Sequence, residues 1–279
     1  MKKKNFKTYL EYIIIVIIGM VLLYPIIWMF FSTFKTNEEI FGSIKLLPKI
    51  FSLEYYKEGW KGYGDYTYKN FFINTFLLVL PTTALTIISS SVVAYGFARF
   101  KFPLKKILFS ILIATLMLPN SVIIIPRYTL FNEFNWIDTY LPFYAPALLA
   151  CYPFFTYMLI QFLRGLPTEL DESSYIDGCG TLRTFTSILL PLMKPAIFSA
   201  ALFQFLWTYN DYFNSLIFIN SVSKFPISLA LRMSLDGESV VVWGKVMAMA
   251  SIAVLPVIIL FFMAQKYFVE GIATSGLKG

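Results

Sequence analysis

The sequence contains no histidine, and charged residues make up only 14% of its 279 positions. A soluble domain carries about 25% charged residues, so this chain is short of the groups that normally face water. Without histidine it lacks the commonest metal ligand and the usual proton carrier at neutral pH. Histidine-based metal catalysis and a histidine proton relay therefore find no support, and we expect no metal site.

A phosphate-binding loop is missing as well. The pattern GxxxxGK[ST], whose backbone amides cradle nucleotide phosphates, does not occur in the sequence. We therefore expect no catalytic residue in this chain, no cofactor bound by it and no ATP hydrolysis by it.

Apolar residues dominate instead, with 58% hydrophobic and 19% aromatic residues. A helix needs roughly 20 apolar residues to cross the hydrocarbon core of a bilayer. Five uncharged apolar intervals reach this length, at 12–34, 70–98, 107–126, 139–163 and 246–265. A sixth apolar stretch begins near Pro195, is interrupted by Asp211, and resumes as far as Ile219. The sequence thus predicts an all-α membrane protein with about six transmembrane helices, in contact with membrane lipid.

Basic residues flank the first two apolar intervals and indicate the orientation, because short cytoplasmic segments are rich in Lys and Arg. They are Lys2, Lys3, Lys4, Lys7, Arg99, Lys101, Lys105 and Lys106. We expect cytoplasmic N- and C-termini, an external loop at 35–69 and a cytoplasmic loop at 164–195. Cys151 then lies in a span and Cys179 in the cytoplasm, so no disulfide is expected.

The basic N-terminus followed by an apolar run is also typical of a cleaved signal peptide. That interpretation is disfavoured here, because the run is long for such a peptide and FFSTF offers no small-residue cleavage site.

The polar segment 172–195 and its flank carry more acids than bases, which is unusual for a cytoplasmic loop. The acids are Glu169, Asp171, Glu172 and Asp177, against Arg164, Arg183 and Lys194. Attraction to an anionic membrane surface favours basic residues. A protein partner is the simpler explanation.

Local signals predict two short helices in this loop. Thr168 can cap a helix that runs through Glu172 to Tyr175, with acids in its first turn. Gly178 and Gly180 permit a sharp turn. Thr181 can cap a second helix with Leu182, Phe185 and Leu189 at helical spacing, until Pro191 and Pro195 end it. An ordinary interhelical loop with a surface helix remains the alternative.

The same residues resemble the EAA loop of ABC importer permeases, which supplies the coupling helix for the cytoplasmic ATPase. The matching positions are Glu172, Ser173, Ser174, Asp177, Gly178, Ile188, Leu190 and Pro191. The resemblance implies that Glu172, the serine pair, Asp177, Gly178, Leu190 and Pro191 serve coupling. Ser173 and Ser174 stand where the family usually has two alanines, which makes the helix face more polar and leaves the choice of ATPase open.

The resemblance extends over nearly the whole chain and indicates the carbohydrate-importer branch. FSTFKTNEEIF, AYGFARFKF, LMLPNSVIIIPRYTLF and WTYNDYFNSLIFI carry it, together with the Asn74-Thr75 pair. The ending VEGIATSGLKG resembles the tail of the maltose importer's second permease subunit. For that tail the resemblance implies contact with the ATPase through Gly271, Ser275, Gly276, Lys278 and Gly279.

The resemblance also implies a fold, an organisation and a set of partners. The fold is the type I ABC importer transmembrane domain: a first helix and external loop at 1–69, a core at 70–268 containing the coupling loop, and a cytoplasmic tail at 269–279. Expected partners are a second permease, two ATPase subunits that bind ATP and Mg, an extracytoplasmic solute-binding protein and a sugar. No nucleic acid is expected, and the location implied is a bacterial-type inner membrane, crossed several times.

Asp211 is the one acid that interrupts an apolar stretch, and insertion of such a group costs about 2.5 to 3.5 kcal/mol. It should therefore face protein or water. Gln204, Trp207 and Asn210 are near it in the sequence and are candidates for a sugar path by hydrogen bonding and ring stacking. The alternative is polar contact between helices or subunits.

Other functions stay open at this stage. A glycerol-phosphate or polyol importer would share these motifs. A secondary transporter would need no ATPase but usually has more spans and an ion relay, and a membrane scaffold or receptor would need neither. The external loop at 220–245, which in the maltose importer probes the binding protein, can equally be a solvated loop.

Overall fold

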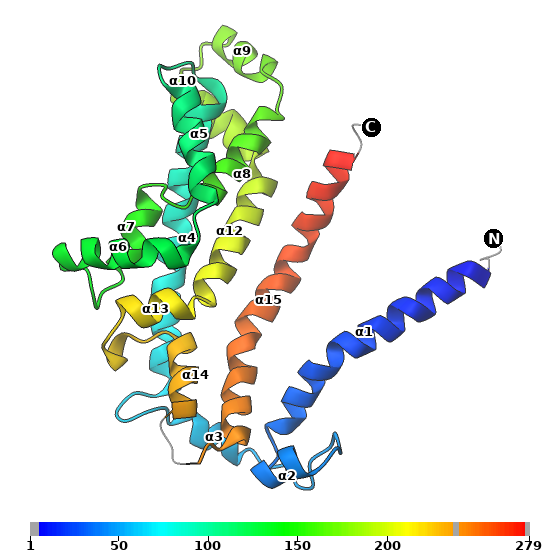
Figure 1. Cartoon of the computed structure of the whole chain (residues 1–279). Helices are drawn as coiled ribbons and strands as arrows, with labels where there is room; N and C mark the ends of the chain where they lie inside the picture. The colour runs from blue at the N-terminus through cyan, green and yellow to red at the C-terminus, as the bar shows by residue number, and fades with distance from the viewer. Residues whose placement is uncertain (1–5, 237–239, 277–279) are drawn as a thin grey trace. The chain divides into compact units, whose positions relative to one another are not determined.

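The computed structural model of the chain describes residues 6–236 and 240–276, and Figure 1 shows these as helices joined by turns. In this part of the chain no strand forms, and one isolated bridge pairs Tyr63 with Tyr66. The chain divides into two compact units, one made of residues 1–69 and 230–256, the other of residues 70–229 and 257–279. Each unit is described by itself. The all-helical prediction is confirmed.

The first unit contains a long apolar helix and several shorter helical segments. Its helices are α1 (Phe6–Ser32), α2 (Asn37–Gly42), α3 (Glu54–Trp60), most of α14 (Ile227–Asp236) and the beginning of α15 (Trp243–Gly276). Between residues 8 and 31 no side chain of α1 is buried in the chain itself, and most are exposed. A helix that is apolar on every side requires an apolar environment, so α1 fits a lipid-facing span.

Asn37 ties the start of α15 to α2 within this unit. Its amide nitrogen donates to the Val241 carbonyl at 2.7 Å, and its amide oxygen accepts the Trp243 N–H at 2.9 Å. The Trp243 ring meets Phe41 edge-on at 5.9 Å. One side chain thereby satisfies a donor and an acceptor at the entrance to a helix, where backbone groups lack partners.

The second unit holds most of the helices, and α4 runs through it. They are α4 (Tyr68–Arg99), α5 (Lys105–Leu116), α6 (Asn120–Glu133), α7 (Leu141–Leu148), α8 (Pro153–Arg164), α9 (Glu169–Ile176), α10 (Thr181–Thr184), a π-helical turn (Phe185–Leu189), α11 (Leu190–Leu192), α12 (Lys194–Tyr209), α13 (Tyr212–Phe218), a 3-10 turn (Val222–Lys224) and the first residues of α14 (Ile227–Asp236). Helix α8 packs against α5 and α12.

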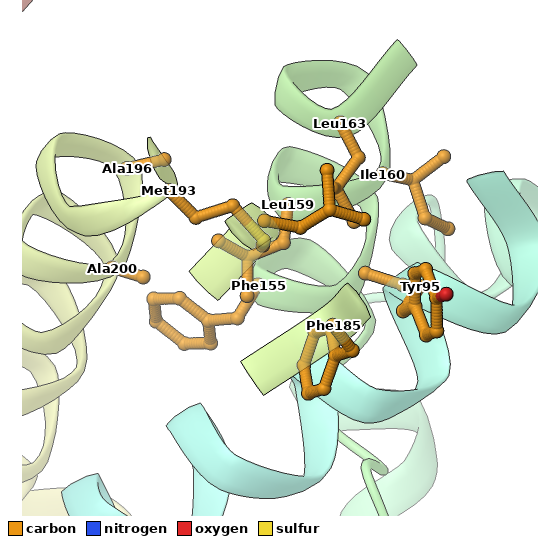
Figure 2. Close-up of a cluster of buried hydrophobic side chains, with 11 residues drawn as sticks. Tyr95, Phe155, Leu159, Ile160, Leu163, Phe185, Met193, Ala196 and Ala200 are labelled. Atoms are coloured by element: carbon orange, nitrogen blue, oxygen red, sulfur yellow. The ribbon is translucent and has the colours of Figure 1, made fainter. Parts of the chain in front are cut away.

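Two apolar clusters hold this unit together. The first gathers side chains from α4, α8, the π-helical turn and α12, with Phe155, Leu159 and Leu163 of α8 fully buried at its centre (Figure 2). The second surrounds Phe218, whose ring meets Phe131 at 5.4 Å and Phe143 at 6.1 Å, both edge-on. The first cluster lies beside the loop 164–195 and supports it.

Four helical segments of the described chain are long and apolar enough to cross a membrane, and six are counted if each of two bent pairs is one span. The predicted interval 107–126 is not one straight helix, because α5 and α6 meet at 107°. Pro119 stands at the break. Proline has no N–H and disfavours helical geometry in the residue before it, so the helix stops there.

The apolar stretch that begins near Pro195 is not one continuous helix either. Helix α12 ends at Tyr209, and Asp211 begins α13 as its N-cap instead of interrupting a continuous helix. Together α10 to α12 form the second bent pair, with 75° between Thr181–Leu192 and Lys194–Tyr209. Pro195 occupies the first turn of α12, where its missing N–H costs nothing.

Candidate functional site

The loop 164–195 forms the predicted pair of short helical arms, at one end of the second unit (Figure 1). The first arm is α9, and its first turn carries the acids Glu169, Asp171 and Glu172, which the helix dipole favours. Thr168 directly precedes it, but its side chain forms no cap. Its carbonyl instead accepts the N–H groups of Asp171 and Glu172 at 3.0 and 3.2 Å.

The turn after α9 is a Schellman motif, and it explains why the sequence needs Asp177-Gly178. The Cys179 N–H donates to the Ser174 carbonyl at 2.9 Å, and the Gly178 N–H donates to the Tyr175 carbonyl at 3.1 Å. Gly178 has φ +78°, in the left-handed region that other residues rarely adopt. The predicted sharp turn is present, and Gly178 makes it.

The second arm departs from prediction in two details. Gly180, and not Thr181, occupies the N-cap position of α10. Phe185 and Leu189 are buried as expected, whereas Leu182 is 75% exposed. The α10 helix is one turn long and passes into the π-helical turn, which widens the winding and moves Leu182 off the buried face.

Proline explains the π-helical turn. Pro191 stands two residues after the π-helical turn Phe185–Leu189 and lies inside the short helix α11, so it does not itself end the second arm as predicted. A proline ring clashes with the carbonyl four residues earlier in a regular α-helix, and a widened turn relieves the clash. Leu190 is partly buried against the first apolar cluster, and Pro191 is exposed.

The remaining predicted coupling residues lie on the surface of α9 and its turn, with one exception. Glu172, Ser173, Asp177 and Gly178 are exposed. Ser174 is buried, and its hydroxyl lies 2.8 Å from that of Thr184 on the second arm.

Large apolar side chains are exposed next to these residues. They are Tyr175, Ile176 and Leu182, at 50%, 86% and 75% exposure. An exposed set of large apolar side chains with acids beside it is typical of a surface that binds another protein.

Arg99 and Tyr95 at the end of α4 were not predicted as part of this site, although they lie in the AYGFARFKF motif. Arg99 forms an ion pair with Asp171 at 2.9 Å, and Tyr95 stacks on Phe185 with ring centroids 4.8 Å apart. The signal available in the sequence was an arginine at the end of an apolar interval. Its partner lies 72 positions away, which no local pattern reveals.

Of the four candidate path residues, one is buried, two are exposed and Asp211 is partly exposed. Gln204 is 2% exposed and donates its amide N–H to the Thr208 hydroxyl at 2.8 Å. Trp207 is 50% exposed and packs on Phe154 and Phe155. Asn210 is exposed at the end of α12, where its side chain donates to the Leu206 carbonyl. Only Trp207, Asn210 and the partly exposed Asp211 are open to a ligand from this surface.

Asp211 belongs to a string of polar side chains that joins two helices. Its carboxylate accepts the Asn214 N–H at 3.0 Å and the Asn214 amide at 2.8 and 3.0 Å. Asn214 accepts in turn from Asn120 at 3.5 Å, and Asn120 accepts from Arg127 at 3.3 Å. The string connects α13 with α6, so it joins helices and also presents polar groups at the bend.

The loop after α13, predicted to be external, is held by Asp138. This carboxylate accepts the N–H groups of Asn220 and Ser221, the Ser221 hydroxyl and the Lys224 ammonium, all within 2.9 Å. Burial raises the pKa of Asp138, but these donors outweigh it and hold the pKa below its usual value. Lys224 therefore has a structural partner.

Three of the five candidate ATPase-contacting residues at the C-terminus lie among the residues that the structure describes. Helix α15 continues to Gly276, so Gly271, Ser275 and Gly276 lie in a helix and not in an irregular glycine-rich tail. Lys278 and Gly279 lie outside the described residues. Within the residues that are described, no group of three or more His, Cys, Asp or Glu side chains is placed to hold a metal ion.

Comparison with known proteins identifies the family to which this chain belongs. Residues 86–274, more than half of the chain, match the family described as "Binding-protein-dependent transport system inner membrane component". The chain belongs to this family of transporter permeases. The loop 164–195 lies wholly inside the matched region.

Individual relatives cover the whole length. The chain is 29% identical to the trehalose/maltose transport system permease protein MalG of Thermococcus litoralis, over 100% of both chains. It is 31% identical to the arabinooligosaccharides transport system permease protein AraQ of Bacillus subtilis, over 94% of this chain and 92% of that protein. These relatives confirm the resemblance to carbohydrate ABC importer permeases.

A solved structure shares the fold. It is a chain of a bacterial ABC transporter involved in the import of the acidic polysaccharide alginate, with a TM-score of 0.81 over 96% of this chain and 99% of the other. At 18% identity this likeness concerns the fold, which is that of an ABC transporter permease.

Proposed function

We propose that this chain is one of two permease subunits of an ATP-driven importer for a sugar or oligosaccharide, and that it couples to a separate ATPase through the loop 164–195. The observation that carries the proposal is the surface of this loop: Glu172, Tyr175, Ile176 and Leu182 are exposed on two arms whose inner sides are buried. A rigid element with an exposed apolar and acidic surface suits a mechanical contact. Family membership and the sugar-permease relatives support the same function.

The proposal includes an orientation and a set of partners. With the N-terminus in the cytoplasm, the loop 164–195 and the end of α15 face the cytoplasmic ATPase, and the segment after α13 faces an external solute-binding protein. The location is then the bacterial inner membrane. ATP and Mg bind to the ATPase pair, whose closure displaces the loop, and the attached helices alternate between inward and outward openings. A second permease supplies the other half of the path.

For Asp211 we favour a role in joining helices. Its two carboxylate oxygens already accept three hydrogen bonds from Asn214, and through Asn214 they reach α6. Trp207 and Asn210 are better placed to meet a sugar, since one offers an exposed ring for stacking and the other an exposed amide.

Reconstitution tests the function. The permease is co-expressed with its partner subunits, purified through a tag, and placed in liposomes with the external binding protein. We expect ATPase subunits to co-purify and labelled maltooligosaccharide or arabinooligosaccharide to enter only when ATP is supplied. Uptake that is unaffected by ATP depletion, with no ATPase in the purified complex, would indicate a secondary transporter instead. The same uptake assay with labelled glycerol phosphate and labelled polyols tests whether the cargo is one of these compounds instead of a sugar.

The surface of the loop is tested by a matched pair of variants. Ile176→Asp places a charge where an exposed apolar side chain would be buried by the ATPase, and we expect ATPase co-purification to fall by about tenfold, as for a binding hot spot. Ile111→Asp places the same charge on an exposed apolar residue of α5, outside the loop. That control should alter membrane insertion and leave the affinity of inserted protein for the ATPase unchanged.

A further inference from the structure

Arg99, the last residue of α4, holds the entrance to α9 through three contacts. Its Nε lies 2.9 Å from Oδ2 of Asp171 as an ion pair. Its Nη2 donates to the carbonyls of Leu166 and Pro167 at 3.1 and 3.4 Å. The accepting groups lie on both sides of the point where α9 begins, so the guanidinium fixes the position and the direction of this helix together.

Burial makes these contacts more than a surface ion pair. The side chains of Arg99 and Asp171 are only 8% and 13% exposed. Exposed pairs contribute little, whereas removal of one partner from a buried pair leaves an uncompensated charge. The planar fork of arginine binds carboxylate and carbonyls at once, which a lysine ammonium cannot reproduce in the same geometry. Arginine is therefore the residue type that this arrangement requires.

Tyr95, one turn earlier on α4, holds the second arm. Its ring stacks on Phe185 with an interplanar angle of 20°, and Figure 2 shows the two rings side by side. Its hydroxyl donates to the Thr181 carbonyl at 3.3 Å. Because the Ser174 and Thr184 hydroxyls join the two arms at 2.8 Å, the end of α4 and the whole loop form one connected body.

We infer that Arg99 is a positioning residue for energy coupling, which locks the loop to α4 so that displacement of α9 by the ATPase moves α4. This inference rests on the proposed function. Helix α4 has 32 residues, and Leu78, Val79 and Ala94 along it are fully buried. A rigid, packed helix of this length carries a displacement at its end toward the middle of the transmembrane core, whereas a loop tethered only by its chain ends would absorb it.

The inference is tested by Arg99→Gln in the reconstituted complex with its ATPase, second permease and binding protein. Sugar uptake and ATP hydrolysis are measured in the same vesicles. We expect ATPase co-purification to persist and hydrolysis to continue, while the amount of sugar imported per ATP falls by about fivefold or more, the usual range of a coupling between sites. Asp171→Asn should lower the ratio too, and the double variant should be no worse than the more severe single variant, because both remove one interaction.

Arg164→Gln is the matched control. Arg164 is an exposed arginine at the end of α8, and its guanidinium lies 4.5 Å from the centre of the Phe109 ring. The same change of residue there removes a positive charge from the loop's flank without releasing α9. Its ratio of uptake to hydrolysis should equal that of the unmodified complex.

An unchanged ratio in Arg99→Gln overturns the inference, and so does loss of ATPase binding in that variant, because Arg99 would then be a structural anchor only. If Arg99→Gln does not accumulate in the membrane, Arg99→Lys replaces it. The lysine keeps the charge and loses the fork, so a lowered ratio supports the inference and a normal ratio overturns it. An unmodified complex without ATPase or ATP-dependent uptake would overturn the proposed function itself, which is a separate outcome.

Discussion

The hydroxyls of Ser174 and Thr184 lie 2.8 Å apart in the interior of the loop 164–195 and join its two arms. Ser174 is 2% exposed, and its hydroxyl also donates to the Asp171 carbonyl. Ser173, its neighbour, is exposed and bonds only within its own helix, to the Leu170 carbonyl. The two serines therefore differ: Ser174 stabilises the loop, whereas Ser173 is the one whose side chain is open to the proposed ATPase partner.

Ser174→Ala should destabilise the loop by about 1 to 2 kcal/mol, because it deletes the hydrogen bonds of the Ser174 hydroxyl to Thr184 and to the Asp171 carbonyl. Thr184 keeps a bond to the Gly180 carbonyl, so the loss stays small. The measurement is the thermal midpoint of the purified permease in detergent. Ser173→Ala is the control and should leave the midpoint unchanged; an equal shift in both variants would contradict the assignment.

Gly178→Val should disturb the turn between the arms. The cost arises from the backbone, since φ is +78° and no heavy atom lies within 4 Å of the position a Cβ would occupy. Left-handed geometry costs a residue with a Cβ about 1 to 2 kcal/mol, and less for asparagine. We expect reduced sugar uptake for valine, a milder loss for Gly178→Asn, and none for Gly180→Ala, where φ is −74°. Equal uptake for all three would show that the turn tolerates other geometries.

Glu172→Lys should lower ATP-dependent uptake while the protein still inserts into the membrane. The exposed carboxylate is the acid at the position matching the EAA loop, and reversal of its charge opposes a contact built for an acid. Glu169→Lys is the matched control, since Glu169 is another exposed acid in the first turn of α9 and gives the same unfavourable dipole effect. Normal uptake and ATPase association in Glu172→Lys would argue against docking through this residue.

The variants Asp211→Ala and Asp211→Asn distinguish a structural role of Asp211 from contact with the transported sugar. Alanine removes the N-cap of α13 and should cost about 0.5 to 2 kcal/mol of stability. Asparagine removes the charge and can still cap the helix. If Asp211 joins helices, only the alanine variant loses thermal stability and assembly. A change in sugar uptake by Asp211→Asn, with normal stability, would support contact with the cargo.

The lowered pKa of Asp138 predicts that the stability of the protein depends on pH. Its pKa is lowered in the folded protein, so its contribution to stability is complete above the unfolded pKa of about 3.9 and decreases as the pH falls further. The thermal midpoint should therefore drop below about pH 4. Asp138→Asn should melt at a lower temperature at neutral pH, and its thermal midpoint should fall less on acidification. If the midpoint of this variant falls as much as that of the unmodified protein, the acid sensitivity comes from other carboxylates.

The sequence by itself determined the class of protein and the presence of two short helical arms in the loop 164–195. Apolar intervals of membrane-spanning length follow from composition, because a bilayer demands about 20 such residues in a row. The turn at Gly178 was also predictable, since a glycine after a short polar helix is a local signal for its end. These properties depend on neighbours along the chain, which the sequence displays directly.

The tertiary structure decided the rest. The buried position of Ser174 depends on how the two arms pack, because its hydroxyl meets that of Thr184 on the second arm. The contact between Arg99 and Asp171 joins residues 72 positions apart. Such pairings are set by which surfaces meet when the helices assemble, and no periodicity in the sequence encodes them. The structure therefore identifies α4 as the helix to which the loop 164–195 is fixed.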